Sequence, residues 1–322
     1  MLISVASPCS LSLGLARWAA DGPNPLAWLG VTLQHPPISL EARPAAILNV
    51  TGARAGLAHA QAARGMERLG LPGGELEIEY AIPSNMGLGS EPLMGLTAAR
   101  TLALLAEHPA AADPAALAEA AGVSAGESLA RWGFEAGGLL LTAARTAAGG
   151  WPARLRRHEL AHPDDRSWAW VLHLPHVPDG TAPGLEAEQT AALLRAAPRL
   201  SVETGRLVDE ALWPAVERDD MPAFGRALNE LQALNRAALE QAGTPPLTPP
   251  DTQSVLDVLR DNGALAWGQS ATGLARFGLI RGASPSIELR RALARHVGHE
   301  GGTVMAAICD NSGARHTLKP EN

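Results

Sequence analysis

Lysine, cysteine and long apolar runs are scarce in this 322-residue sequence, and each scarcity excludes a class of protein. Lys319 is the only lysine, no basic run occurs and the formal charge is −7, so we expect no nucleic-acid partner. Cys9 and Cys309 lack Cys-x-x-Cys spacing, which argues against a zinc knuckle or a disulfide framework. No uninterrupted apolar stretch approaches the roughly 20 residues that cross a bilayer, so we expect no membrane partner.

The composition is that of a soluble globular protein, with 46% hydrophobic and 18% charged residues. Residues 1–16 are apolar but interrupted by serines and a proline, which predicts a β-strand and not a signal peptide. We therefore expect a cytoplasmic protein. The length allows two domains, and the polar break His162-Pro163-Asp164-Asp165 predicts domains at 1–165 and 166–322.

Apolar periodicity predicts an α+β protein in which strands and helices are mixed in both halves. The strands are expected at residues 3–15, 29–33, 38–41, 47–50, 76–82, 168–174, 264–267, 275–280 and 303–309. Residues 139–142 and 155–160 flank Gly149-Gly150 and are expected to form a hairpin. The helices are expected at residues 54–69, 91–107, 114–121, 186–197, 201–217, 221–241, 251–261 and 285–298.

A glycine-rich loop at residues 82–90, Ile-Pro-Ser-Asn-Met-Gly-Leu-Gly-Ser, connects a predicted strand to a predicted helix. Such a loop is often only a tight connection, but a helix start also presents unpaired N–H groups and a dipole that favours anions. We therefore predict a phosphate or diphosphate site. Its candidate residues are Pro83, Ser84, Asn85, Gly87, Leu88, Gly89 and Ser90.

A second loop, Trp267 to Leu274, lies between two predicted strands and is rich in small and hydrogen-bonding residues. Taken alone, this loop could equally be a plain hairpin turn or a ligand-binding loop. If it faces the first loop, it would close the anion site from the other side. The candidate residues here are Gly268, Gln269, Ser270, Thr272 and Gly273.

The pattern Pro-x-x-x-Gly-Leu-Gly-Ser at residues 83–90 resembles the phosphate loop of the GHMP kinase superfamily of small-molecule kinases. The second loop is at the place where that superfamily has a glycine-rich loop facing the first. The resemblance implies a two-domain GHMP-kinase-like α+β fold. Its N-terminal domain would be ribosomal-S5-domain-2-like and its C-terminal domain ferredoxin-like, with the active-site cleft between the loops.

Further strings are similar to one branch of the superfamily, the β-ribofuranosylaminobenzene 5′-phosphate synthases. They are Gly268 to Gly273, Phe134-Glu135-Ala136-Gly137-Gly138, Asp179-Gly180 to Glu186, and Asn311-Ser312-Gly313-Ala314-Arg315. The branch joins phosphoribosyl pyrophosphate to 4-aminobenzoate or 4-hydroxybenzoate and releases pyrophosphate and CO2, toward a methanopterin-type cofactor. The resemblance implies this activity, a phosphorylated small-molecule substrate, Mg²⁺ with Ser90 as its ligand, and a homodimer.

Several positions depart from the family and keep two other functions open. GHMP kinases transfer phosphate from ATP and carry an aspartate before the Gly-Gly pair, where this chain has Ala130, so Glu127 and Glu135 are the candidate catalytic carboxylates. The synthase branch has an arginine and a histidine where this chain has Ser10 and Ser12. An ATP-dependent kinase and a non-catalytic protein that binds a phosphorylated metabolite therefore remain as alternatives.

Overall fold

The structure is a computed structural model that describes residues 2–18, 26–144, 151–160, 165–176, 184–243 and 248–319. Three predicted features lie outside these residues. They are Gly149-Gly150 of the hairpin, His162 to Asp164 of the polar break, and Asp179-Gly180. The domain boundary at residue 165 therefore stays a prediction. Among the helices within the described ranges, none is long and apolar enough to cross a membrane.

The first sheet has the strand order β11-β1-β2-β4-β3, and β5 joins it through β2 and carries β6 at its other edge. Its strands are β1 (Leu2–Arg17), β2 (Leu26–Pro44), β3 (Asn49–Gly52), β4 (Gly74–Tyr80), β5 (Leu139–Ala143), β6 (Arg154–His158) and β11 (Arg315–Lys319). The predicted hairpin is confirmed, because β5 pairs antiparallel with β6. The strands predicted at 29–33 and 38–41 are parts of the single strand β2, which pairs with β5 along its first part and β4 along its last.

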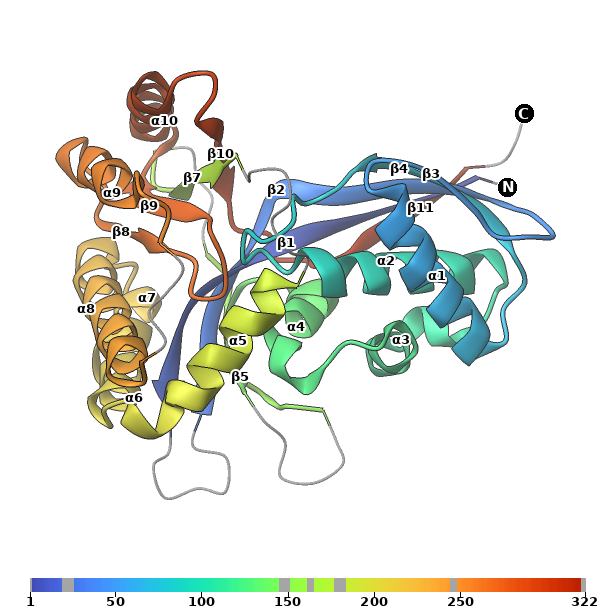
Figure 1. Cartoon of the computed structure of the whole chain (residues 1–322), viewed down its shortest axis with the longest axis horizontal. Coiled ribbons are helices and arrows are strands. Elements are labelled where there is room, and N and C mark those ends of the chain that lie inside the picture. The colour runs from blue at the N-terminus through green and yellow to red at the C-terminus, as the bar shows by residue number, and fades with distance from the viewer. Residues whose placement is uncertain are drawn as a thin grey trace.

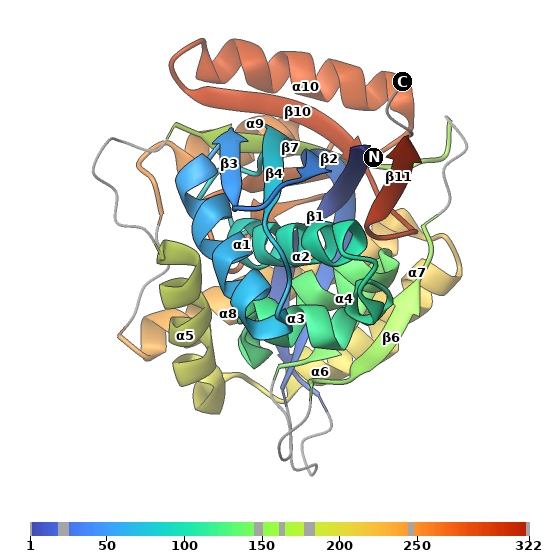
Figure 2. The same ribbon diagram turned by 90° about the vertical axis from the view of Figure 1, so that its right-hand side faces the viewer.

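Helices cover one face of the first sheet (Figure 1, Figure 2). They are α1 (Ala55–Leu69), α2 (Ser90–Leu105), α3 (Pro114–Ala121) and α4 (Ser128–Ala136). Asp113 caps α3 as predicted, since its side chain accepts hydrogen bonds from the N–H groups of Ala115 and Ala116. The central helix α2 is buried on nearly every side, which explains its run of leucine, alanine and threonine.

The second sheet has the order β10-β7-β9-β8, with helices on both faces. Its strands are β7 (Trp168–Pro175), β8 (Ala266–Gln269), β9 (Arg276–Arg281) and β10 (Gly302–Ile308). The helices of this half are α5 (Leu185–Ala196), α6 (Glu203–Leu207), α7 (Trp213–Glu217), α8 (Met221–Gln241), α9 (Thr252–Asp261) and α10 (Ala283–Val297). Period-two alternation along β7 sends Trp168 toward Phe224 of α8, while Ala169 and Val171 pack against α9 and α10.

Backbone hydrogen bonds at Asp310 join the two sheets. Here the chain leaves β10 and returns to form β11 beside β1. The N–H of Asp310 donates to Thr32 O, and Gly138 N donates to Asp310 O at 2.6 Å. The buried carboxylate of Asp310 accepts from the N–H groups of Ser312 and Gly313. Two of the strings that carry the resemblance to the synthase branch, 134–138 and 311–315, therefore build a backbone junction.

Candidate functional site

The two glycine-rich loops lie against each other, as the sequence predicts. The N–H of Leu274 donates to Asn85 O at 2.9 Å, and Ala275 N donates to Met86 O at 3.1 Å. The hydroxyl of Ser270 donates to Gly87 O at 2.9 Å. These bonds fix the path of the first loop between β4 and α2.

Glycine is required where the loops touch. Gly87 and Gly89 have φ angles of 71° and 73°, in the left-handed region that favours glycine. A Cβ atom on Gly273 would lie 2.1 Å from Gly87 N, and one on Gly87 would lie 2.2 Å from Ser270 Oγ. The glycines therefore serve close backbone approach, whether or not a ligand is bound.

The candidate loop residues are in different environments. Leu88 is in the hydrophobic core, where its carbonyl accepts from Ser10 N, and Asn85 is also buried. Pro83 is exposed and Ser84 half-buried. Gly268 packs on Gln232, and the side chain of Gln269 donates to Gly273 O. Three of the predicted binding residues, Gly87, Gly89 and Thr272, line a cavity beside the first loop.

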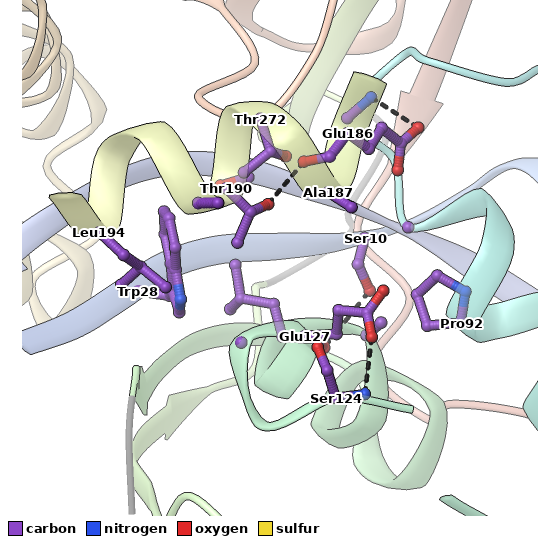
Figure 3. Close-up of a pocket in the computed structure, with 17 residues that line it drawn as sticks. Ser10, Trp28, Pro92, Ser124, Glu127, Glu186, Ala187, Thr190, Leu194 and Thr272 are labelled. Carbon is purple, nitrogen blue, oxygen red and sulfur yellow. Dashed lines mark hydrogen bonds between the residues drawn. The ribbon is translucent and has the colours of Figure 1, made fainter. Parts of the chain in front are cut away.

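A cavity of about 280 Å³ opens beside the first loop. In Figure 3, Glu186, Thr190 and Leu194 project from α5 on one side, and Ser124 and Glu127 lie opposite, in the segment before α4. The residues that line it are Ser10, Ser12, Trp28, Gly87, Gly89, Pro92, Ser124, Gly126, Glu127, Leu129, Ala130, Glu186, Ala187, Thr190, Ala191, Leu194 and Thr272. This volume is at the small end of ligand pockets, so the cavity suits a small metabolite.

Among the described residues, the lining of the cavity has apolar side chains, serine and threonine hydroxyls and two carboxylates, and no basic side chain. Ser10 and Ser12, where the synthase branch has basic residues, both lie in its wall. Glu127 and Glu186 are its two charged residues. Arg54 lies close enough to Glu186 and Glu91 to interact electrostatically, and its guanidinium donates to Ile82 O at 2.7 Å. The described lining therefore offers two carboxylates to a ligand, with Arg54 close to one of them.

Glu186 is bonded to the first loop, where the sequence predicts an anion site. Its Oε1 accepts from Gly87 N at 2.9 Å and lies 3.5 Å from Ser90 Oγ at the start of α2 (Figure 3). Burial raises the pKa of Glu186 to about 7, with Glu91 and Glu127 adding to the rise and Gly87 and Arg54 opposing it. Because the N–H of Gly87 donates to a carboxylate here, it is able to bind an anionic group.

The two predicted catalytic carboxylates are in different places. Glu127 lies in the cavity wall, where its Oε2 accepts from Ser124 N at 2.7 Å, and burial raises its pKa. Glu135 is exposed, forms an ion pair with Arg131 at 3.1 Å and does not line the cavity. The structure therefore brings Glu127, but not Glu135, to the site. Ala130, which the resemblance aligns with the aspartate of the kinases, lies in the wall.

Other candidate ligand groups are engaged elsewhere. Arg276 is buried and bonded to Asp251, Thr252 and His173, and Arg281 pairs with Asp219. Within the described ranges, no cluster of three or more His, Cys, Asp or Glu side chains could hold a metal ion.

Stability is expected to fall at high pH because of Glu186. The pKa of Glu186 in the folded state, about 7, is above its ordinary value, so the protonated carboxyl group stabilises the folded state relative to the unfolded state. This contribution to the free energy of unfolding is complete below about pH 4.5 and is lost as the pH rises through 7. Between about pH 5 and about pH 8 the loss should be on the order of 2 kcal/mol. Urea unfolding of the wild type and Glu186→Gln at both pH values measures it. Equal pH dependence in the two proteins would contradict the environment assigned to Glu186.

Comparison with known proteins identifies the fold. No family model and no curated protein sequence matches the chain. Homoserine kinase from Cytophaga hutchinsonii is similar in structure, with a TM-score of 0.64, 17% identity, and 98% of this chain and 97% of that chain covered. L. major mevalonate kinase, solved with R-mevalonate, gives 0.67 at 14% identity, with 96% of both chains covered. Lactococcus lactis galactokinase, solved with galactose, gives 0.67 at 15%, covering 98% of this chain and 95% of that chain.

At these identities the likeness shows the fold, and the predicted fold class is confirmed: the chain has the mixed α/β, two-sheet fold of the GHMP small-molecule kinases. The likeness concerns the fold and assigns no activity to the chain. The similarity spans almost the full length of the chain and of these kinases.

Proposed function

We propose that this protein is a small-molecule kinase that transfers a phosphoryl group from ATP to a hydroxyl group of an acceptor bound in the cavity. The observation that carries the proposal is the placement of a small cavity directly beside a helix-start anion site, in a chain with the GHMP-kinase fold. In this arrangement the nucleotide phosphates replace the carboxylate of Glu186 at Gly87 N and the start of α2.

ATP and Mg²⁺ fit the donors that the loop offers. The N–H of Gly87 and the hydroxyl of Ser90 suit phosphate oxygens, and the Ser90 hydroxyl and neighbouring carboxylates are the hard oxygen donors that Mg²⁺ prefers. Ser90 is the proposed protein ligand of Mg²⁺, as the resemblance implies. When bound, Mg²⁺ would neutralise charge on the transferring phosphoryl group.

The acceptor hydroxyl needs a group that takes its proton during transfer. Ala130 cannot do so, and Glu127 is held by Ser124 N. Glu186 lies in the cavity wall beside the loop, and phosphate binding at Gly87 would free its carboxylate to accept that proton. We assign Glu186 this role.

Phosphoribosyl transfer to a benzoate has less support. A benzoate would have to enter a cavity whose lining has two carboxylates and, among the residues that the structure describes, no basic side chain, and burying a carboxylate without a partner is costly. The fold comparisons also favour a kinase. Cytoplasmic location and homodimer formation remain expectations drawn from the sequence.

Incubation with Mg²⁺ and γ-labelled ATP plus a panel of small alcohols tests the proposal. We expect acceptor-dependent transfer of label and formation of ADP, and both should be lost in Gly89→Val, because valine is strained at φ 73°. A parallel reaction contains phosphoribosyl pyrophosphate with 4-aminobenzoate or 4-hydroxybenzoate. Joint release of pyrophosphate and CO2 there, with no label transfer from ATP, would establish the synthase activity instead.

A further inference from the structure

The charge pattern of the cavity identifies the class of acceptor. We propose that the acceptor is a small amino alcohol with an apolar body, whose ammonium group binds between Glu127 and Glu186. The inference deepens the proposed function, since it names the molecule that would receive the phosphoryl group. It concerns binding, however, and can be tested without any transfer.

The first argument is that two carboxylates share the cavity wall. Glu127 and Glu186 come from opposite sides of the cavity (Figure 3), and among the described residues no basic side chain shares the lining with them. Arg54 reaches Glu186 electrostatically but lies outside the wall and is bonded to Ile82 O. Both carboxylates are partly exposed and each accepts a backbone N–H, so a cationic ligand between them would add the opposite charge that the described lining does not supply.

The second argument is the apolar body of the cavity. Trp28, Leu129 and Leu194 line the cavity, together with Pro92, Ala130 and alanines of α5. Trp28 is 1% exposed and presents an aromatic side chain to a cation or a hydrocarbon group. A ligand that was only polar would leave this surface without a partner.

The third argument is an unused polar group. Ser12 lines the cavity and is 4% exposed, and its hydroxyl has no hydrogen-bond partner in the part of the chain that the structure describes. Buried hydroxyls are almost always bonded, so Ser12 is expected to bond a polar group of the ligand. An amino alcohol supplies both the cation for the carboxylates and a hydroxyl for such a contact.

Three compounds that differ in one substituent test the proposal by calorimetry without nucleotide. Each is a benzene ring with a hydroxymethyl group. The substituent para to it is an aminomethyl, a hydroxymethyl or a carboxylate group. At about pH 8 we expect the amine to bind about tenfold more tightly than the diol, and the acid more weakly than the diol. Equal binding of the three, tighter binding of the acid, or binding of none would overturn the proposal.

Conservative variants locate the charge that is recognised. Glu127→Gln and Glu186→Gln keep an oxygen acceptor for Ser124 N and Gly87 N, and each should remove most of the preference for the amine. Glu188→Gln is the control, because Glu188 is exposed on the same helix and does not line the cavity. Loss of the preference in Glu188→Gln, or its full retention in both cavity variants, would refute the assignment.

The pH dependence provides an independent readout. The groups that act on Glu186 are Glu91 on α2, Glu127 before α4 and Arg54 before α1. As the pH falls below about 7, Glu186 takes up a proton, so the amine should lose its advantage over the diol. An advantage that is unchanged at about pH 5.5 would contradict the role of Glu186.

Failure of this inference is distinguishable from failure of the proposed function. An amine preference in calorimetry with no label transfer from ATP would retain the ligand class and reject the kinase. Label transfer to the diol or the acid in preference to the amine would retain the kinase and reject the ligand class.

Discussion

Gly273→Ala is expected to separate the two glycine-rich loops and abolish nucleotide binding. The new Cβ would lie 2.1 Å from Gly87 N and 2.3 Å from Met86 C, and neither backbone atom can rotate away as a side chain would. The loops must move apart, which breaks the bonds from Leu274 and Ala275 to the first loop. Overpacking of this kind should cost roughly 2–3 kcal/mol of stability. Calorimetric titration with ATP and urea unfolding measure the two effects.

Gly56→Ala is the matched control for this change. Gly56 is in α1, has no φ in the left-handed region, and a Cβ there would meet nothing within 4 Å. The same substitution at this site should raise stability by about 0.5–1 kcal/mol and leave nucleotide binding unchanged. If Gly273→Ala binds ATP as well as Gly56→Ala does, the loop contact is not part of the site.

Glu186→Gln is expected to tighten nucleotide binding while slowing phosphoryl transfer. In the wild type, the carboxylate holds Gly87 N and lies near the position of the incoming phosphates. Removal of that charge at about pH 8 should strengthen ATP binding about tenfold, or roughly 1.4 kcal/mol. Transfer should slow because the amide cannot accept the acceptor's proton. Titration of ATP and single-turnover label transfer separate the two effects.

Glu188→Gln again provides the comparison, since it changes the charge of α5 by the same amount at an exposed position. It should bind ATP and transfer phosphate as the wild type does. ATP binding that is weaker in Glu186→Gln than in Glu188→Gln would mean that Glu186 assists nucleotide binding instead of competing with it.

The local parts of the fold could be predicted from the sequence because their signals are local. Period-two alternation in 76–80, the glycines of the loop and the apolar run after Ser90 correctly predict β4, the turn and α2. The Asp113 cap likewise predicts α3. Such features depend on neighbouring residues, so a single sequence contains enough information.

Two elements were missed because distant contacts determine them. The helix α4 (Ser128–Ala136) includes an Arg-Trp pair and a glycine, and its buried face packs against β1, β2, β5, α2 and α3. The strand β11 (Arg315–Lys319) is exposed throughout and exists because β1 offers an unpaired edge. The segment of α4 is amphipathic but spans only nine residues, and the segment of β11 has no apolar alternation.

The site was predicted only in part, for a similar reason. Both loops were identified, and Ser10, Ser12 and Glu127 were singled out by comparison with the family. Glu186 is 99 residues from Gly87 in the chain, and no spacing rule connects them. Trp28 and Thr190 were also missed, since an aromatic residue in a strand and a threonine in a helix carry no signal of a cavity wall. One feature of the sequence could have indicated Glu186. It lies at the start of a predicted helix and within the string Asp179-Gly180 to Glu186, which resembles the synthase branch.

The most direct test of the central claim is a crystal structure with Mg²⁺ and a non-hydrolysable ATP analogue. The account predicts nucleotide phosphates on the N–H groups at Gly87 and the start of α2, with the carboxylate of Glu186 displaced from Gly87. It would be contradicted by a nucleotide bound elsewhere, or by phosphates at the loop while Glu186 keeps its bond to Gly87.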